Sequence, residues 1–315
     1  MSLSKRLIFL AFILLLFGSV LAACGGEPVP VQDKNADFVL ALPRLVVDVD
    51  ENGIPTVAGL SPELLSLLGV DVKQFALPPD VVNWFTQANV QHIELVQKDD
   101  GIYIFVNGVL MPHLGWDTDD LQNMTDAMTK LGVVKPEFQT ILRVLVPFIQ
   151  HTGLDVVLRF PLQPSAEKIP MRDVNEPIPT VATASDVSPM AVVKANVEFD
   201  ENGVPSILGL STQDLADAGL AGLRNIGLAQ DTLQKLKEAE IAKIKVKTTP
   251  EGMVFWINDE QLPYIVWNDE YLNRAADLYA QLYFMPRYEL QRELVKTILP
   301  AISRIEGEFT FEFPQ

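Results

Sequence analysis

The sequence predicts an α+β fold, an antiparallel sheet packed with helices, present as two tandem copies of one duplicated domain. The first observation is a stretch of twelve residues, DENGIPTVAGLS from Asp50, that returns as DENGVPSILGLS from Asp200. The second is a longer pair, GIYIFVNGVLMPHLGWDTDDL from Gly101 and GMVFWINDEQLPYIVWNDEYL from Gly252. The third is a short alternating strand that closes each copy, LDVVLRFP or EFTFEFP. A repeat of about 120 residues is too long for a solenoid, so the pattern indicates duplication of a whole domain.

These repeats divide the chain. We expect a signal peptide over 1–23, a lipidated tether over 24–42, a first repeat domain over 43–161, a Pro-rich linker over 162–191 and a second repeat domain over 192–315. The linker is assigned from its prolines and its lack of apolar periodicity. Each repeat has its own strands and helices, so we expect each to fold separately.

A hairpin opens each repeat. In LVVDVDENGIPTVAG, two short apolar runs flank Asn52 and Gly53, and Asn-Gly is the strongest short signal for a hairpin turn. The segments SPELLSLLG and PPDVVNWFTQAN follow, each beginning with Ser or Pro and carrying apolar residues at helical spacing. We therefore expect a strand pair and then helical turns.

The second half of each repeat returns to strands before it becomes helical. HIELVQ and IYIFV read as strands, with a turn at Asn107 and Gly108. Two longer helical stretches follow, over 117–131 and about 136–150. In the closing strands, alternate residues fall on one apolar face: Leu154, Val156, Leu158 and Phe160 in the first copy, and Phe309, Phe311 and Phe313 in the second.

The N-terminus has the three parts of a secretory signal: Lys5 and Arg6, then an apolar run, then small residues that lead to Cys24. The segment LAACGG resembles the lipobox of bacterial lipoproteins. The resemblance covers residues 1–26 and implies that Cys24 is lipidated, with palmitate among the attached chains. The body would then hang from the outer face of the cell membrane, or from the outer membrane of a diderm. An ordinary signal peptide or a short membrane anchor is the alternative.

Composition restricts the partners. The chain carries 41 acidic and 24 basic residues, a net charge of −17, and this balance repels phosphate backbones. We expect no nucleic acid partner. The single cysteine excludes an internal disulfide framework.

A calcium-loop pattern occurs in the first hairpin. Asp48, Asp50, Asn52 and Gly53 have the spacing of the first half of an EF-hand loop. However, the twelfth position, where a bidentate glutamate belongs, is Gly59, and the flanks alternate as strands do. A plain hairpin explains these residues, so we predict no metal site.

The WDTDD motif at 116–120 has the DxD spacing of metal-dependent glycosyl transfer, but the second copy reads WNDEY, with Asn268 in place of Asp117. Asp and Asn are both good N-cap residues. Trp116 would then precede the cap and Leu121 would follow it, as in a hydrophobic staple. We predict a structural cap.

No catalytic group is assigned. The histidines, His92, His113 and His151, are far apart and lack metal-ligand spacing. The serines have no nucleophile-elbow motif around them. We therefore predict no catalytic residue and no cofactor, and we consider an enzyme less favoured than a binding protein.

Three function classes stay open. The favoured one is a noncatalytic lipoprotein that binds a small molecule or an envelope protein. The second is a solute-binding lipoprotein of a transporter, although such receptors resemble two α/β lobes with repeated crossover strands. The third is an extracytoplasmic hydrolase, whose catalytic residues can assemble from distant positions.

Tyrosines distinguish the second copy and suggest where a ligand lies. Tyr271 and Tyr283 align with Asp120 and Gly132 of the first copy, so neither ring is needed to complete the shared fold. Amphipathic rings at such positions are common contact residues. We predict that Tyr271 and Tyr283, with Tyr264, line a binding groove; the alternative is that they cover the edge of a larger core.

Overall fold

The computed structural model describes residues 40–41, 43–57, 59–60, 76–117, 119–133, 146, 152–178, 191–207, 209–217, 219, 227–282 and 289–315. The predicted signal peptide and almost all of the predicted tether lie outside these residues. The segment SPELLSLLG (61–69) also lies outside them, as does the stretch 136–150 apart from Val146.

The described residues belong to two compact units. Unit 1 takes those within Met1–His113, Gln150–Val181 and Asn273–Leu299. Unit 2 takes those within Leu114–Ile149, Ala182–Leu272 and Pro300–Gln315. Each unit therefore combines the strands of one sequence repeat with helical residues of the other.

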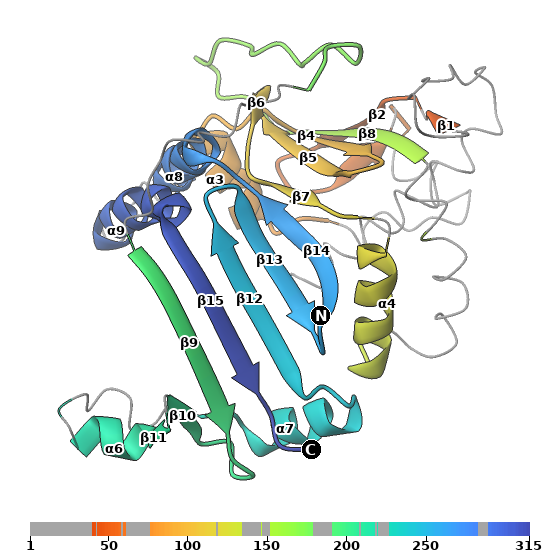
Figure 1. The fold of residues 1–315 in the computed structure, drawn as a ribbon. Coiled ribbons are helices and arrows are strands. Elements are labelled where there is room, and N and C mark those ends of the chain that lie inside the picture. The colour runs from red at the N-terminus through yellow and green to blue at the C-terminus, as the bar shows by residue number, and fades with distance from the viewer. Residues whose placement is uncertain are drawn as a thin grey trace. The chain divides into compact units, whose positions relative to one another are not determined.

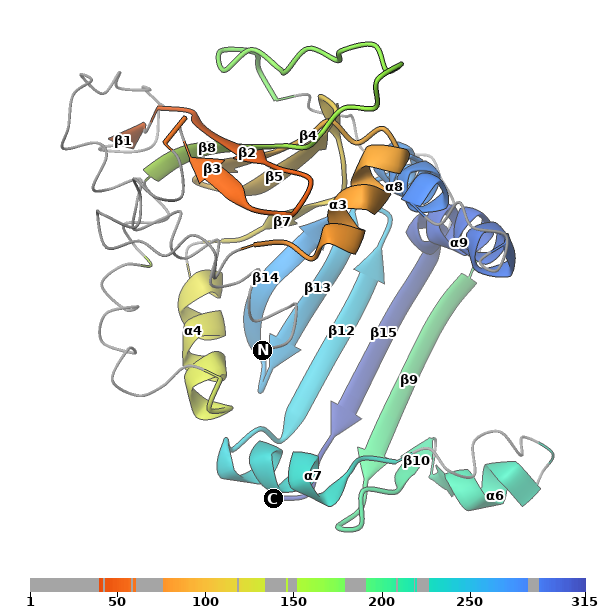
Figure 2. The same ribbon diagram turned by 180° about the vertical axis from the view of Figure 1, so that it is seen from behind.

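Unit 1 is built on a mostly antiparallel sheet in the order β3-β2-β8-β4-β5 (Figure 1; β3 is labelled in Figure 2). Strand β8 pairs in parallel with β2 and β1, whereas β4 pairs antiparallel with β8 and β5, and β6 pairs with β5. The bounds are β1 (Leu40–Ala41), β2 (Leu45–Val49), β3 (Pro55–Val57), β4 (His92–Lys98), β5 (Gly101–Val106), β6 (Val109–Leu110) and β8 (Thr152–Arg159). Strand β7 (His113–Gly115) falls at the boundary between the two units.

The core of unit 1 lies on one face of this sheet. Helix α3 (Pro79–Gln87) places Val82 and Phe85 there, and the ring of Phe85 lies 4.8 Å from that of Phe160. Helix α8 (Asp269–Leu282) adds Leu278 and Leu282. Full burial of a side chain of this size contributes about 1.5–3 kcal/mol. Leu278 and Leu282 are partly buried against this cluster, so residues of the second repeat are part of the hydrophobic core of unit 1.

Unit 2 has the sheet order β11-β10-β9-β15-β12-β13-β14. Strand β15 runs parallel to β9 over eight residue pairs and antiparallel to β12. The bounds are β9 (Ala191–Phe199), β10 (Pro205–Ile207), β11 (Leu210–Ser211), β12 (Lys243–Thr249), β13 (Gly252–Ile257), β14 (Glu260–Val266) and β15 (Ile305–Glu312).

The helices of unit 2 include one from the first repeat. Helix α7 (Gln230–Glu238) crosses one end of the sheet in Figure 2, where Leu236 and Ile241 are buried. Leu131, which directly follows α4 (Asp120–Lys130), packs against the same cluster. The remaining helical elements are α6 (Thr212–Asp217), α9 (Glu289–Ala301), most of which belongs to unit 1, and the 3-10 turn η5 (Ile302–Arg304).

The same hairpin turn occurs in both units. The carboxylate of Asp50 accepts hydrogen bonds from the N–H groups of Asn52 and Ile54 at 2.9 and 2.8 Å. Asp200 accepts bonds of the same two lengths from the residues two and four positions after it. Gly53 has φ +78°, and a Cβ there would lie 1.9 Å from the carbonyl oxygen of Leu77. The predicted hairpin is confirmed, and Asp50 and Asp200 stabilise the turn, whereas Asp48 pairs with Arg159.

A second bond pattern also recurs. The amide oxygen of Asn107 accepts from the N–H groups of Gln91 and His92, and its Nδ2 donates to Asn89. Asn258 makes the three corresponding bonds in unit 2. The mixed α and β architecture with mostly antiparallel strands is therefore confirmed. Within the described residues, no helix is both long and apolar enough to cross a membrane.

Candidate functional site

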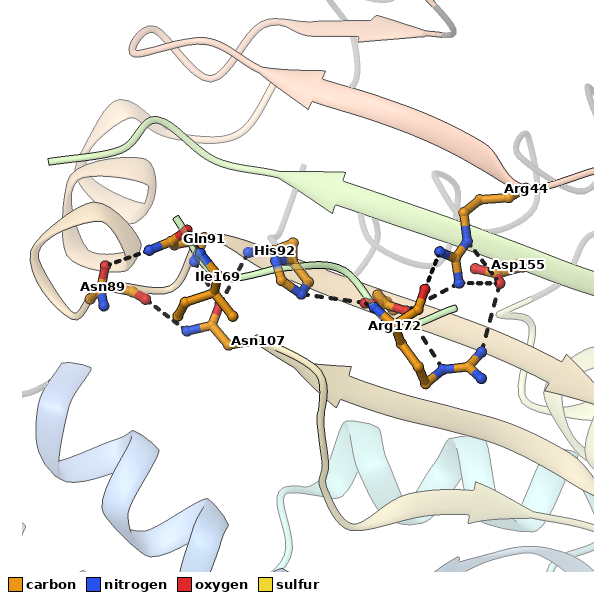
Figure 3. Close-up of polar contacts among 9 residues, drawn as sticks. Arg44, Asn89, Gln91, His92, Asn107, Asp155, Ile169 and Arg172 are labelled. Carbon is orange, nitrogen blue, oxygen red and sulfur yellow. Dashed lines mark hydrogen bonds and ion pairs between the residues drawn. The ribbon is translucent and has the colours of Figure 1, made fainter. Parts of the chain in front are cut away.

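A group of largely buried charged side chains lies on the sheet of unit 1 (Figure 3). Arg44 comes from the residue before β2, Glu94 from β4 and Asp155 from β8. Arg172 comes from the segment 162–178, which has neither helix nor strand and which we call the strap. Three neighbouring strands and the strap thus place their charges on one face of the sheet.

Glu94 is fully buried and contacts three residues. Its Oε1 accepts the backbone N–H of Arg172 at 3.1 Å, and its Oε2 accepts Nη2 of Arg44 at 3.3 Å. Nε2 of His92 lies 3.3 Å from Oε1, an ion-pair distance that lacks hydrogen-bond geometry. Glu94 therefore holds the strap through its backbone and the sheet through a guanidinium.

Asp155 is the second buried acid. Its Oδ2 accepts Nε and Nη2 of Arg44 at 3.0 and 2.7 Å and lies 3.8 Å from Nη2 of Arg172. Arg44 also donates from Nη1 to the carbonyl oxygen of Arg172 at 2.6 Å. Both backbone polar groups of Arg172 are thus held by charged side chains of the sheet, one from buried Glu94 and one from partly buried Arg44.

Burial tends to raise the pKa of Glu94, but the His92 side chain, the backbone N–H of Arg172 and the Arg44 guanidinium lower it, and the net shift is downward. A carboxylate with a lowered pKa is a weak proton acceptor and is not protonated at neutral pH, so it serves poorly in general acid–base chemistry. This charge balance suits an anchor for the strap.

Other contacts extend this attachment along the strap. The side-chain amide of Gln91 donates to the carbonyl of Glu167 at 2.7 Å and accepts the N–H of Ile169 at 2.9 Å. Gln163 donates to the carbonyl oxygens at the end of α3, and the guanidinium of Arg172 lies 4.9 Å from the centre of the Phe105 ring. Although proline content predicted a linker, the described part of this segment is bound to unit 1.

The corresponding face of unit 2 has an aromatic residue and charged residues at the same strand positions. Glu94 faces Phe105 across β4 and β5, and Lys245 faces Trp256 across β12 and β13. Arg44 pairs with Asp155, and Lys194 lies 3.8 Å from Glu308. Phe105 is 1% exposed, whereas Trp256 is half-buried and the Lys194 side chain is 74% exposed. The face that is covered in unit 1 is thus partly exposed in unit 2.

The predicted site residues are found in different settings. Cys24 and Tyr283 lie outside the described residues. Tyr271 is 4% exposed. Its ring is therefore packed in the core, as in the alternative stated above, and we do not place it in a binding surface. Tyr264 is half-buried, and its ring lies so close to Gly115 that a Cβ there would be 2.6 Å from it.

The helix caps differ between the copies. Asn268 accepts the N–H of Tyr271 at 2.8 Å, which confirms the cap predicted for the second copy. In the first copy the prediction is wrong, because Asp119 is the N-cap and makes no side-chain cap bond. Asp120 instead accepts the N–H of Asp117 at 2.8 Å.

In the part of the chain that the structure describes, no group of three or more His, Cys, Asp or Glu side chains is placed to hold a metal ion.

Sequence reasoning missed Arg44, Glu94, Asp155 and Arg172. One signal was present: His92, Glu94 and Asp155 are ionisable residues inside otherwise apolar strands. Alternation assigns such residues to a solvent-facing side of the sheet, so it could not reveal that the strap covers them. Comparison of the chain with protein-family models, with curated proteins and with solved structures gives no match.

Proposed function

We propose that this protein is a noncatalytic binding lipoprotein, anchored outside the cell through Cys24 and built from two copies of one domain. The lipobox-like LAACGG segment supports the anchor. The paired hairpin and asparagine bonds at Asp50 and Asp200, and at Asn107 and Asn258, support duplication. Its partner is an envelope protein.

The observation that carries the binding role is the difference between the two sheet faces. In unit 1 the face around Glu94 and Phe105 is covered by the strap, and its charges are paired. In unit 2 the face around Lys245 and Trp256 keeps partly exposed aromatic and charged groups. Tyr and Trp rings with one accessible side are common contact residues in interfaces. We assign binding to this face of unit 2, which we call the β12 face and define by Lys194, Lys245, Lys247, Trp256 and Glu308.

A photo-crosslinking amino acid at Lys247 of the full chain tests this assignment in cells. Lys247 is exposed on the β12 face, and Lys237, which is also exposed, is the control on α7. We expect an adduct with an envelope protein from position 247 and none from position 237. The wild-type chain should incorporate labelled palmitate and sediment with membranes, whereas Cys24→Ser should do neither. Equal adducts from both positions would contradict the assignment, and membrane retention of Cys24→Ser would contradict the anchor.

A further inference from the structure

We infer that the β12 face binds an extended polypeptide segment that carries a glutamate or aspartate opposite Lys245. The inference rests on the proposed function and adds the chemical class of the partner. It starts from unit 1, where the equivalent face already holds an extended polypeptide, the strap. The comparison between the two faces then shows which features a partner of unit 2 must have.

Of the strap residues that unit 1 holds, Arg172 is the one bound by the charged group. Glu94 accepts its backbone N–H, Arg44 donates to its carbonyl oxygen, and Phe105 lies beneath its guanidinium. Such contacts use only a backbone amide unit and one charged side chain. They fit an extended peptide of many sequences, provided that the charge is complementary to the sheet.

In unit 2 the aromatic ring and the outer ion pair are retained, but the central charge is reversed. Lys245 can donate a hydrogen bond to a partner, and it cannot accept a backbone N–H as Glu94 does. Lys245 occupies the position of Glu94, and its Nζ lies 4.2 Å from the centre of the Trp256 ring. Lys194 and Glu308 occupy the positions of Arg44 and Asp155. A partner residue that takes the place of Arg172 must therefore be acidic, since a basic one would meet the ammonium group of Lys245.

The other lysines on this strand favour a single carboxylate over a polyanion. Lys243 forms an ion pair with Asp259 at 2.7 Å. Lys247 faces Glu308 across the pair of strands β12 and β15. The chain as a whole carries a net charge of −17, which repels nucleic acid and anionic lipid surfaces. Lys245 lies over the Trp256 ring, with its Nζ 4.2 Å from the ring centre, and it also attracts the Asp259 carboxylate, to which Lys243 is directly bonded.

A charge exchange between protein and peptide tests the inference. The probes are two fluorescein-labelled peptides with the strap sequence 162–178, one native and one with Arg172→Glu. Binding to the full chain in detergent is measured by fluorescence anisotropy. We expect the wild-type protein to prefer the Arg172→Glu peptide by about tenfold, and the Lys245→Glu protein to prefer the native peptide by a similar factor. Lys245→Gln should show no preference.

Several results would overturn the inference. They are equal binding of both peptides, no binding of either, or a preference that Lys245→Glu leaves unchanged. Anionic vesicles, DNA and the unlabelled peptide are also compared as competitors, each at the same concentration of negative charge. If vesicles or DNA displace the labelled peptide at a lower concentration than the unlabelled peptide does, the face binds a polyanion. Thermal unfolding checks that each variant is folded, and Lys245→Gln provides a second variant if Lys245→Glu is not. The crosslinking experiment separates this inference from the proposed function. If position 247 forms an adduct in cells but the peptides give any of these results, the β12 face is a binding surface for another class of ligand.

Discussion

Single glycines show how closely the two turn regions are specified. Gly53 and Gly108 both have positive φ, +78° and +76°. They differ in the space around them, because a Cβ on Gly108 would meet no atom within 4 Å, whereas one on Gly53 would overlap the backbone of Leu77. The carbonyl of Gly53 also accepts the N–H of Leu77 at 2.9 Å. The first turn is therefore fixed by packing as well as by backbone conformation.

This difference leads to a matched pair of substitutions. Gly108→Ala should cost about 1 kcal/mol of unfolding free energy, the cost of a left-handed backbone for a residue with a Cβ. Gly53→Ala should cost about 1–3 kcal/mol more, because the backbone of Leu77 must also move. Urea unfolding of the two variants measures both values. Equal losses would mean that the contact between Gly53 and Leu77 adds nothing to stability.

Among the elements, strands and turns were the most predictable from sequence, and the strap was the least. The strands around Leu154 and Phe309 alternate cleanly, and their single apolar face is sufficient to assign them. The strap has no periodicity, and its attachment depends on buried partners such as Gln91 and Glu94 in a distant strand. The sheet against which a helix packs could not be predicted either. Periodicity identifies the apolar face of α8, but it does not show that Leu278 packs in the core of unit 1.

The attachment of the strap should depend on the charge of Glu94. Glu94→Gln removes one of two buried acids that balance Arg44 and Arg172, and loss of one partner of a buried ion pair costs about 3–5 kcal/mol. The strap should therefore open, and trypsin should cleave after Arg172 faster than in the wild type. Glu167→Gln is the matched control, because that side chain lies exposed on the strap. Cleavage of both variants at the wild-type rate would show that Glu94 does not hold the strap.

The same carboxylate predicts a direction for the effect of pH. The pKa of Glu94 is lowered in the folded chain from its ordinary value of 4.5, so the unfolded chain takes up a proton first as the pH falls. The contribution of Glu94 to stability is present above pH 4.5 and is lost as the pH falls through the lower, folded pKa. In acid-unfolding curves monitored by circular dichroism, Glu94→Gln should lack this part of the acid sensitivity.

At the scale of the whole molecule, the chain crosses repeatedly between the two units. The described residues within 114–149 belong to unit 2, although their repeat supplies strands to unit 1, and the described residues within 273–299 belong to unit 1. In unit 2, Gln261 of β14 donates to the Asp120 carboxylate of α4, and its carbonyl accepts Nδ2 of Asn123 at 2.8 Å. A sheet from one repeat is thus stabilised by a helix from the other.

Because each unit contains residues of both repeats, we expect neither repeat to fold as a separate fragment. The sequence alone suggests that 192–315 folds by itself, but that fragment lacks α4 and Leu131, and it lacks the unit 1 core that receives Leu278 and Leu282. We expect 43–191 and 192–315 each to melt without cooperativity when expressed alone, because each would expose apolar surface that the other buries. Co-expressed, the two fragments should associate and melt cooperatively, since every contact within each unit is then restored. Calorimetry on the separate and combined fragments distinguishes the two cases, and a cooperative transition for 192–315 alone would show that α8 and α9 can pack on the sheet of their own repeat.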